Sequence, residues 1–195
     1  QINYSGSYSW QKPSNFPDLV TSPEWMTLSN ELGRHNVDGG GASWTDEQIA
    51  NAETSDWKSA VMRNTAPQTQ HSLSVSGGTD RVNYYASFGY QYQGSFIQSN
   101  ALNYDKFTLR SNLSAKITNR LKLDVNISGL MDERNTSHYG AWDMIRGLWL
   151  MQPMDPIYQE NGGYTQPSNS TLINPVAMMN TDDVGYKSYK SKWFQ

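Results

Sequence analysis

Four aromatic side chains in the second half of the chain are of a type and spacing suited to ligand binding. Two tryptophans recur at helical spacing in the segment 140–151, and two tyrosines flank an Asn-Gly pair that favours a hairpin turn. Flat rings with polar neighbours suit stacking on a glycan. The same rings would also serve as the core of their own loop, and the sequence leaves both interpretations open. The candidate residues are Trp142, Trp149, Tyr158 and Tyr164.

Residue types that carry catalysis or bind metals are few and scattered. The chain has no cysteine, which excludes a thiolate metal site and a cysteine nucleophile. His35, His71 and His138 lack the spacing of a zinc site, and no Gly-x-Ser-x-Gly motif occurs. The segments Asp38-Gly39-Gly40 and Asp182-Asp183 contain too few ligands for a calcium loop. We therefore expect no enzymatic activity, no cofactor and no metal.

The composition favours a membrane barrel over a conventional globular domain. Of the 195 residues, 36% are hydrophobic and 12% aromatic, and the mean hydropathy is -0.71. A disordered chain would not carry so many aromatic residues. A barrel with a water-filled interior and a narrow apolar outer band accounts for both the low hydrophobic content and the high aromatic content. The net charge of -3 provides no basic surface for nucleic acid, and no apolar run is long enough for a membrane helix.

Six segments alternate apolar and polar residues with the period of a β-strand. In the fourth, Phe107, Leu109 and Leu113 fall on one face, while Lys106 and Arg110 fall on the other. Short turns leave no room for any pairing but antiparallel between the strands that they join. We expect antiparallel strands, each beside its neighbours in sequence, at 2–11, 70–76, 82–94, 105–117, 121–131 and 186–195.

The links between these strands alternate in length. Long loops occupy 12–68 and 133–185, and short turns occupy 77–81 and 118–120. Bacterial outer-membrane barrels have short turns on the periplasmic side and long loops outside. Six strands are too few to close such a barrel, so the others must come from elsewhere in a longer protein. The predicted fold is all-β: an antiparallel transmembrane β-barrel segment, about six strands of a larger barrel, with short helices in long extracellular loops.

The first long loop carries the helix signals. A helix is expected from Ser22, a favourable N-cap, to Gly33. Thr45 and Gln48 have the spacing of a capping box, and a further short helix is expected within 56–63.

Aromatic residues lie on the apolar face of the predicted strands, near the ends that the long loops join. An amphipathic ring suits the headgroup level of a membrane, so these residues are expected to form an aromatic girdle. A sugar platform is the alternative, and it would need the rings to face water in a cleft. The polar face would line the lumen or contact a plug. The girdle residues are Tyr8, Trp10, Tyr90, Tyr92 and Phe107.

Several motifs resemble one family of outer-membrane proteins. The run LSVSGGTDRVNYYASFGYQYQG, followed by Ser95-Phe96-Ile97, closely resembles the early barrel of SusC/RagA-type TonB-dependent receptors. The segments SGSYSWQKP and DWKSAVMRNTAP and the motif Asn174-Pro175-Val176-Ala177 agree with this resemblance, which extends over essentially the whole chain. The chain therefore resembles an internal piece of such a receptor that contains its first barrel strands.

The resemblance implies a set of partners and a location. It implies an outer-membrane barrel of about twenty-two strands, completed by the rest of the receptor and filled by a plug. It also implies that TonB supplies the energy for transport by contacting an N-terminal part of the receptor that is not contained in this chain. A SusD-like surface lipoprotein would present an oligosaccharide or a peptide, and membrane lipid would surround the barrel. The expected function is nutrient uptake across the outer membrane.

Two other interpretations remain open from the residues alone. A secreted β-sandwich could bind glycans through exposed aromatic residues, but it would enclose its apolar strand faces in a core and need not alternate long and short loops. A small complete membrane enzyme or porin would need at least two more strands.

Overall fold

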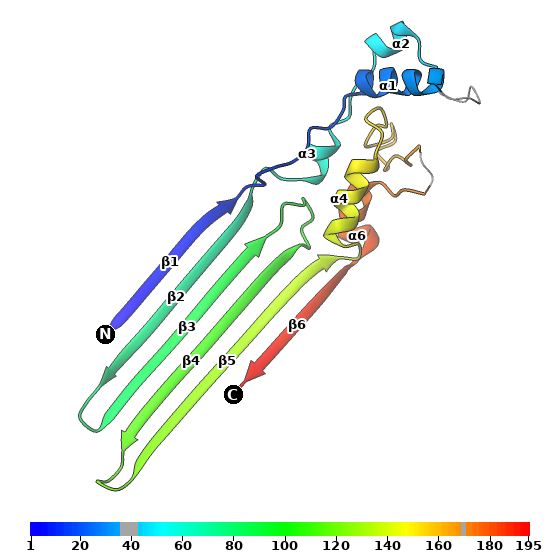
Figure 1. Cartoon of the computed structure of the whole chain (residues 1–195). Coiled ribbons are helices and arrows are strands. Elements are labelled where there is room, and N and C mark those ends of the chain that lie inside the picture. The colour runs from blue at the N-terminus through cyan, green and yellow to red at the C-terminus, as the bar shows by residue number, and fades with distance from the viewer. Residues whose placement is uncertain (36–42, 169–170) are drawn as a thin grey trace.

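Six strands form one antiparallel sheet in the order β1-β2-β3-β4-β5-β6 in the computed structural model, which describes residues 1–35, 43–168 and 171–195 (Figure 1). Each strand pairs with its neighbour in sequence, so the predicted antiparallel arrangement is confirmed. The strands are β1 (Ile2–Gln11), β2 (Ala66–Gly78), β3 (Val82–Gly94), β4 (Asn103–Lys116), β5 (Lys122–Ser137) and β6 (Tyr186–Phe194).

The two short turns are closed by threonine side chains. The backbone N–H groups of Arg81 and Val82 donate to Thr79 Oγ1 at 3.3 and 3.2 Å. In the second turn, the N–H of Arg120 donates to Thr118 Oγ1 at 3.2 Å. Such local hydrogen bonds favour a turn over a continued strand.

Strands β2 and β5 are longer than the sequence pattern indicated. β2 begins at Ala66 rather than at residue 70, and β5 continues to Ser137 rather than ending at 131. The additional residues of β5, 132–137, are mostly polar and lack the apolar alternation. All of them nevertheless pair with β6, and 132–135 also pair with β4, because ladder hydrogen bonds join backbone groups whatever the side chain.

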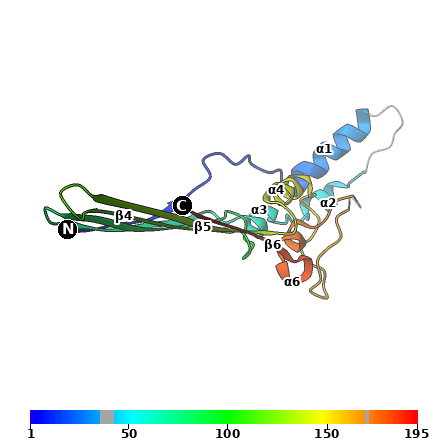
Figure 2. The same cartoon turned by 90° about the horizontal axis from the view of Figure 1, so that it is seen from below.

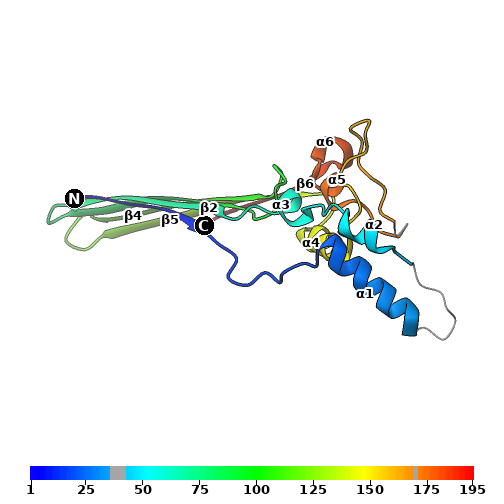
Figure 3. The same cartoon turned by 90° about the horizontal axis from the view of Figure 1, so that it is seen from above.

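Helices occur in the long loops, which lie together at one end of the sheet (Figure 3). Thr45 and Gln48 form the predicted capping box, and Asp56 caps the helix expected within 56–63. The first helix continues past Gly33 to His35, so the predicted end was wrong: a glycine weakens a helix without necessarily ending it. The described helices are α1 (Ser22–His35), α2 (Asp46–Ala50), α3 (Trp57–Val61), α4 (Ala141–Leu150), α5 (Pro175–Met179) and α6 (Thr181–Val184).

The sheet is a single layer, seen edge-on in Figure 2. Among the described residues no second sheet packs against it, and this argues against the β-sandwich alternative. The hydrophobic core lies instead in the loops at the end of the sheet, hereafter the loop layer (residues 12–35, 43–65, 95–102, 138–168 and 171–185), around Val61, Ile97, Met144 and Leu148.

Within the described ranges, no helix combines the length and apolarity that crossing a membrane would require.

Candidate functional site

The register of the sheet sorts its side chains into an apolar face and a polar face. Side chains directly opposite one another on neighbouring strands form rows across the sheet. Between the row of Val82 and the row of Tyr90, Ser111 is the one polar side chain on the apolar face of β3–β5 that is not aromatic. From the turn end to the loop end, the rows are Ile117 with Leu121; Val82 with Ala115 and Leu123; Tyr84 with Leu113 and Val125; Ala86 with Ser111 and Ile127; Phe88 with Leu109 and Gly129; and Tyr90 with Phe107 and Met131.

The length of this apolar band matches the hydrocarbon thickness that a barrel strand crosses. From Phe107 to Ile117 the chain advances ten residues, or about 34 Å at about 3.4 Å per residue. A strand tilt of about 40° reduces this to a height of about 26 Å, close to the roughly 25 Å of an outer-membrane apolar band. The sheet therefore has the dimension of a membrane-crossing wall.

An aromatic belt of Tyr4, His71, Tyr90 and Phe107 ends the band at its loop end. The rings of Tyr90 and Phe107 lie 4.9 Å apart, and His71 stacks between Tyr4 and Tyr90 at 6.1 and 6.5 Å. The polar atoms are satisfied: the Tyr90 hydroxyl donates to Asp105 at 2.8 Å, and the Tyr4 hydroxyl lies 2.7 Å from His71 Nδ1. Apolar rings with hydrogen-bonded polar tips suit a membrane interface.

Gly6 makes room for this belt on β1. A Cβ atom at Gly6 would lie 2.6 Å from the Tyr4 hydroxyl oxygen and 2.8 Å from His71 Nδ1. The Tyr4 ring thus reaches over Gly6 toward β2, and any larger residue at this position would push the two rings apart.

The predicted girdle residues occupy three successive rows rather than one. Tyr90 and Phe107 belong to the belt row, Tyr8 and Tyr92 lie opposite Thr69 in the next row, and Trp10 lies one row further. Tyr8 and Trp10 contact each other edge to face, at 4.6 Å between ring centroids.

Sequence reasoning did not assign Tyr4 and His71 to the girdle. Alternation along their strands places both on the apolar face, but their contact depends on the register between β1 and β2, which joins Gly6 to His71 and Tyr4 to Leu73. That register follows a long loop and cannot be read from a turn motif.

The opposite face of the sheet is mostly polar; its apolar and aromatic side chains include Tyr85, Tyr104, Leu130, Tyr189 and Trp193. Across β1 to β3 it carries serine, asparagine and glutamine, and across β4 and β5 it carries charges. Lys122 and Asp124 form an exposed ion pair at 2.9 Å. Lys106 and Arg110 lie on this face, opposite Asp132 and Ser128 of β5. Such a surface is compatible with water or with another polar protein surface.

In the loop layer, α4 divides its side chains between core and solvent. Met144 and Leu148 are fully buried, whereas Trp142 is 63% exposed and Trp149 is 44% exposed. The two indole rings contact each other edge to face, at 5.9 Å. Trp57 of α3, which sequence reasoning had not singled out, is the buried tryptophan of this core; its Nε1 donates to the Gln152 carbonyl at 3.2 Å.

A pocket of about 450 Å³ lies beside Trp149 between the two long loops. Its wall is largely apolar, and Asp56 lies at its edge. Hydrogen bonds from the Ser59 side chain and backbone hold the pKa of the Asp56 carboxyl below its usual value. The apolar part of the wall includes Leu19, Val20, Trp25, Trp57, Trp149 and Leu150.

Tyr158 and Tyr164 form the predicted hairpin pair. They are joined by an antiparallel bridge, and their rings lie 5.8 Å apart. Tyr158 is 53% exposed, while Tyr164 packs against the core and its hydroxyl accepts from Asn180 Nδ2 at 2.9 Å. The four candidate rings are therefore brought together as two pairs, one on α4 and one on this hairpin.

Among the described residues, no group of three or more histidine, aspartate or glutamate side chains is placed to hold a metal. The segment 38–40 lies outside those residues. His35, His71 and His138 lie in α1, in β2 and after β5, respectively.

No protein-family model matches the chain. It is 28% identical over 179 residues to the TonB-dependent receptor SusC of Bacteroides thetaiotaomicron, a match that covers 87% of this chain and 16% of that protein. It is 28% identical over 205 residues to TonB-dependent receptor P3 of Formosa agariphila, covering 99% of this chain and 19% of that receptor. The chain thus spans less than a fifth of these relatives.

Solved structures with a similar fold belong to RagAB. One, described as a peptide transporter, superposes with a TM-score of 0.61 at 21% identity over 85% of this chain and 22% of that one. Another, described as a peptide importer in an open-open state, gives 0.63 at 20% identity over 90% and 23%. The sequence relatives and the shared fold together confirm the resemblance that the motifs indicated: the chain is similar to a segment of the SusC/RagA-type TonB-dependent outer-membrane receptors.

Proposed function

We propose that this chain is a membrane-crossing wall segment of a TonB-dependent importer in the outer membrane. The observation that carries the proposal is the apolar band of about 26 Å on one face of the sheet, which ends at the aromatic belt on the loop side. In this orientation the band contacts lipid, and the polar face lines the barrel interior.

Loop length supports a direction for the segment in the membrane. The helices and the pocket lie at the belt end of the sheet, and the short turns after β2 and β4 lie at the other end. Because outer-membrane barrels keep their long loops outside, the loop layer would face the cell exterior and form part of the channel mouth.

The intact receptor would act with several partners. The polar face would meet the remaining barrel strands and a plug, and the N-terminal part of the receptor would contact TonB. A SusD-like lipoprotein would cover the mouth. The solute would be an oligosaccharide or a peptide; the peptide class is favoured by the likeness to RagAB, which is itself described as a peptide transporter. A role in import rather than catalysis agrees with the names of the relatives.

Within the mouth, the exposed rings are the best candidates for contact with lid or solute. Trp142 and Trp149 face away from the α4 core, and Tyr158 is similarly exposed above Tyr164. Rings held on a packed scaffold bind with little loss of side-chain entropy, which is why tryptophan and tyrosine dominate binding hot spots.

The test replaces Trp142 and Trp149 together by alanine in the intact receptor. We expect lid association or solute uptake to weaken by roughly tenfold, the scale of a lost aromatic hot spot. Membrane insertion, measured by the heat-dependent mobility of the folded barrel, should be unchanged.

A double change of the same tryptophans to phenylalanine is the matched control, since it keeps a ring at each position and should retain most of the activity. Normal uptake and normal lid binding in an inserted alanine variant would contradict the assignment of these rings. Loss of insertion would assign them to folding instead.

A further inference from the structure

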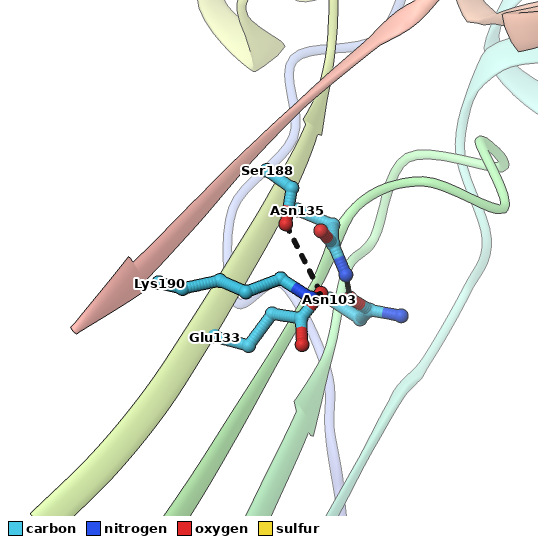
Figure 4. A network of polar contacts seen from close by, with 5 residues as sticks. All are labelled: Asn103, Glu133, Asn135, Ser188 and Lys190. Atoms are coloured by element: carbon cyan, nitrogen blue, oxygen red, sulfur yellow. Dashed lines mark hydrogen bonds and ion pairs between the residues drawn. The ribbon is translucent and has the colours of Figure 1, made fainter. Parts of the chain in front are cut away.

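A group of polar residues lies on the apolar face of the sheet just beyond the aromatic belt. We call Asn103, Glu133, Asn135, Ser188 and Lys190 the polar collar; Figure 4 shows them converging from β4, β5 and β6. Glu133 lies two residues after Met131 of the belt row, and Asn135 two residues further, so the collar continues the face that we assign to lipid.

The height of the collar places it in the headgroup layer of that membrane. Each row adds two residues, about 7 Å along a strand and about 5 Å in height at a tilt near 40°. The rows of Glu133 and Asn135 therefore lie about 5 and 10 Å beyond the belt. A headgroup layer is roughly 5 to 8 Å thick, so the collar spans it.

The collar offers hydrogen-bonding groups of several kinds around a shallow hollow of about 500 Å³. Lys190 Nζ lies 3.2 Å from Glu133 Oε1, and the Ser188 hydroxyl donates to the same oxygen at 3.0 Å. Asn135 Nδ2 donates to Asn103 Oδ1 at 2.9 Å. The side-chain oxygen of Asn135, Oδ1, is buried and accepts no hydrogen bond from the described residues. Carboxylate, amide and hydroxyl groups in one hollow suit the hydroxyl and amide groups of a sugar.

Lys192 adds an uncompensated positive charge at the edge of the collar. It lies opposite Met131, in the belt row of the apolar face, and has no ion-pair partner among the described residues. A lysine at this depth extends its ammonium group toward the headgroups. There it would meet an anion, and the phosphate of a lipid headgroup is the anion that a membrane surface provides.

We propose that the polar collar and Lys192 bind the phosphorylated sugar headgroup of a glycolipid in the outer leaflet. The ammonium group of Lys192 contacts a phosphate, and the collar accepts and donates hydrogen bonds to the sugar. This inference rests on the proposed membrane orientation and goes beyond it by assigning a specific lipid class to one patch of the barrel wall.

The experiment uses the intact receptor in phosphatidylcholine nanodiscs. Purified lipopolysaccharide truncated to its phosphorylated inner core is added, and native mass spectrometry counts the bound molecules; phosphatidylglycerol is the anionic comparison without an aminosugar. We expect saturable binding of the lipopolysaccharide in preference to phosphatidylglycerol. Lys192→Gln should weaken it by about tenfold or more, the scale of a lost charge-assisted contact.

Lys106→Gln is the matched control, because it removes the same charge from the opposite face of the sheet at nearly the same height. It should leave glycolipid binding unchanged. The proposal is overturned by equal binding of both lipids, by equal effects of the two variants, or by a change of oligomeric state in Lys192→Gln without a change in glycolipid binding.

A lipid-soluble quencher distinguishes failure of this inference from failure of the proposed orientation. If a label at Leu113 is quenched from the lipid phase but Lys192→Gln has no effect, the orientation stands and only the glycolipid site is wrong. If the label is not quenched, the membrane orientation itself is wrong.

Discussion

The sheet and the loop layer place their apolar side chains in opposite environments. In the loop layer, buried residues such as Val61, Met144 and Leu148 form one compact core. In the sheet, Leu109 and Ile127 remain 48% and 49% exposed although both lie in the middle of regular strands. Apart from Ala66 at the start of β2, the described buried hydrophobic side chains all lie outside the strands.

This contrast indicates which phase each region is built to meet. The loop layer folds as water-soluble proteins do, by removing apolar surface from water. The sheet leaves a continuous apolar face far larger than a few isolated surface residues, and such a face needs another apolar phase to cover it. A membrane barrel provides both environments: lipid contacts the apolar face and the water-filled lumen contacts the polar face.

The largest expected effect is in the loop core. Leu148→Ala removes a side chain that is 1% exposed and should destabilise the loop layer by about 2 to 5 kcal/mol. Hydrogen exchange should show faster opening of α3, α4 and α5 while the strands keep their protection. Leu150→Ala, on an exposed position of the same helix, is the control and should change little. Equal loosening of the strands would show that the two regions are not independent.

The next effect concerns the apolar band. Leu113 lies in the third of the band's six rows, near its middle. An arginine on the lipid face at this depth destabilises a barrel by about 2 to 4 kcal/mol, and Leu113→Arg should do the same. We expect a corresponding loss of stability in urea titrations of the receptor refolded in lipid. Asn112→Arg, one residue away on the polar face, should cost much less. Equal losses for the two variants would remove the distinction between the faces.

A smaller effect is expected at the cap of α3. Asp56 accepts from the backbone N–H of Ser59 at 2.9 Å, and Asp56→Ala should destabilise the loop layer by about 1 kcal/mol, the usual value of an N-cap. Its pKa is lowered in the folded state, so its contribution is complete above the unfolded-state pKa of about 3.9. The difference between wild type and Asp56→Ala should shrink as the pH falls through the lowered folded-state pKa. Hydrogen exchange of α3 as a function of pH measures it, and a pH-independent difference would contradict this account.

The sequence predicted the sheet better than the loop layer for a physical reason. A strand exposed to lipid on one side and water on the other must alternate, so the positions of Phe107 to Ile117 are readable from the chain itself. The short turns at Thr79 and Thr118 then determine the order of the strands that they join. The polar ends of the strands gave no such signal, which is why the extension of β5 to Ser137 was not anticipated.

The loop core depends on contacts between distant parts of the chain. Val61, Ile97 and Leu148 meet in one cluster although they come from three different loops. Nothing in the local periodicity of any one segment indicates these partners. The helical spacing of Trp142 and Trp149 predicted α4, but only the packing of Met144 and Leu148 determines that both indoles face outward.

The most direct test of the account is the environment of two neighbouring residues on β4. Single cysteines at Leu113 and Asn112 of the intact receptor, in a background without other reactive cysteines, are labelled and exposed to a lipid-soluble and a water-soluble quencher. We expect the label at Leu113 to respond to the lipid-soluble quencher and the label at Asn112 to the aqueous one. The reverse result, or water access to both positions, would contradict the claim that the apolar face of this sheet contacts membrane lipid.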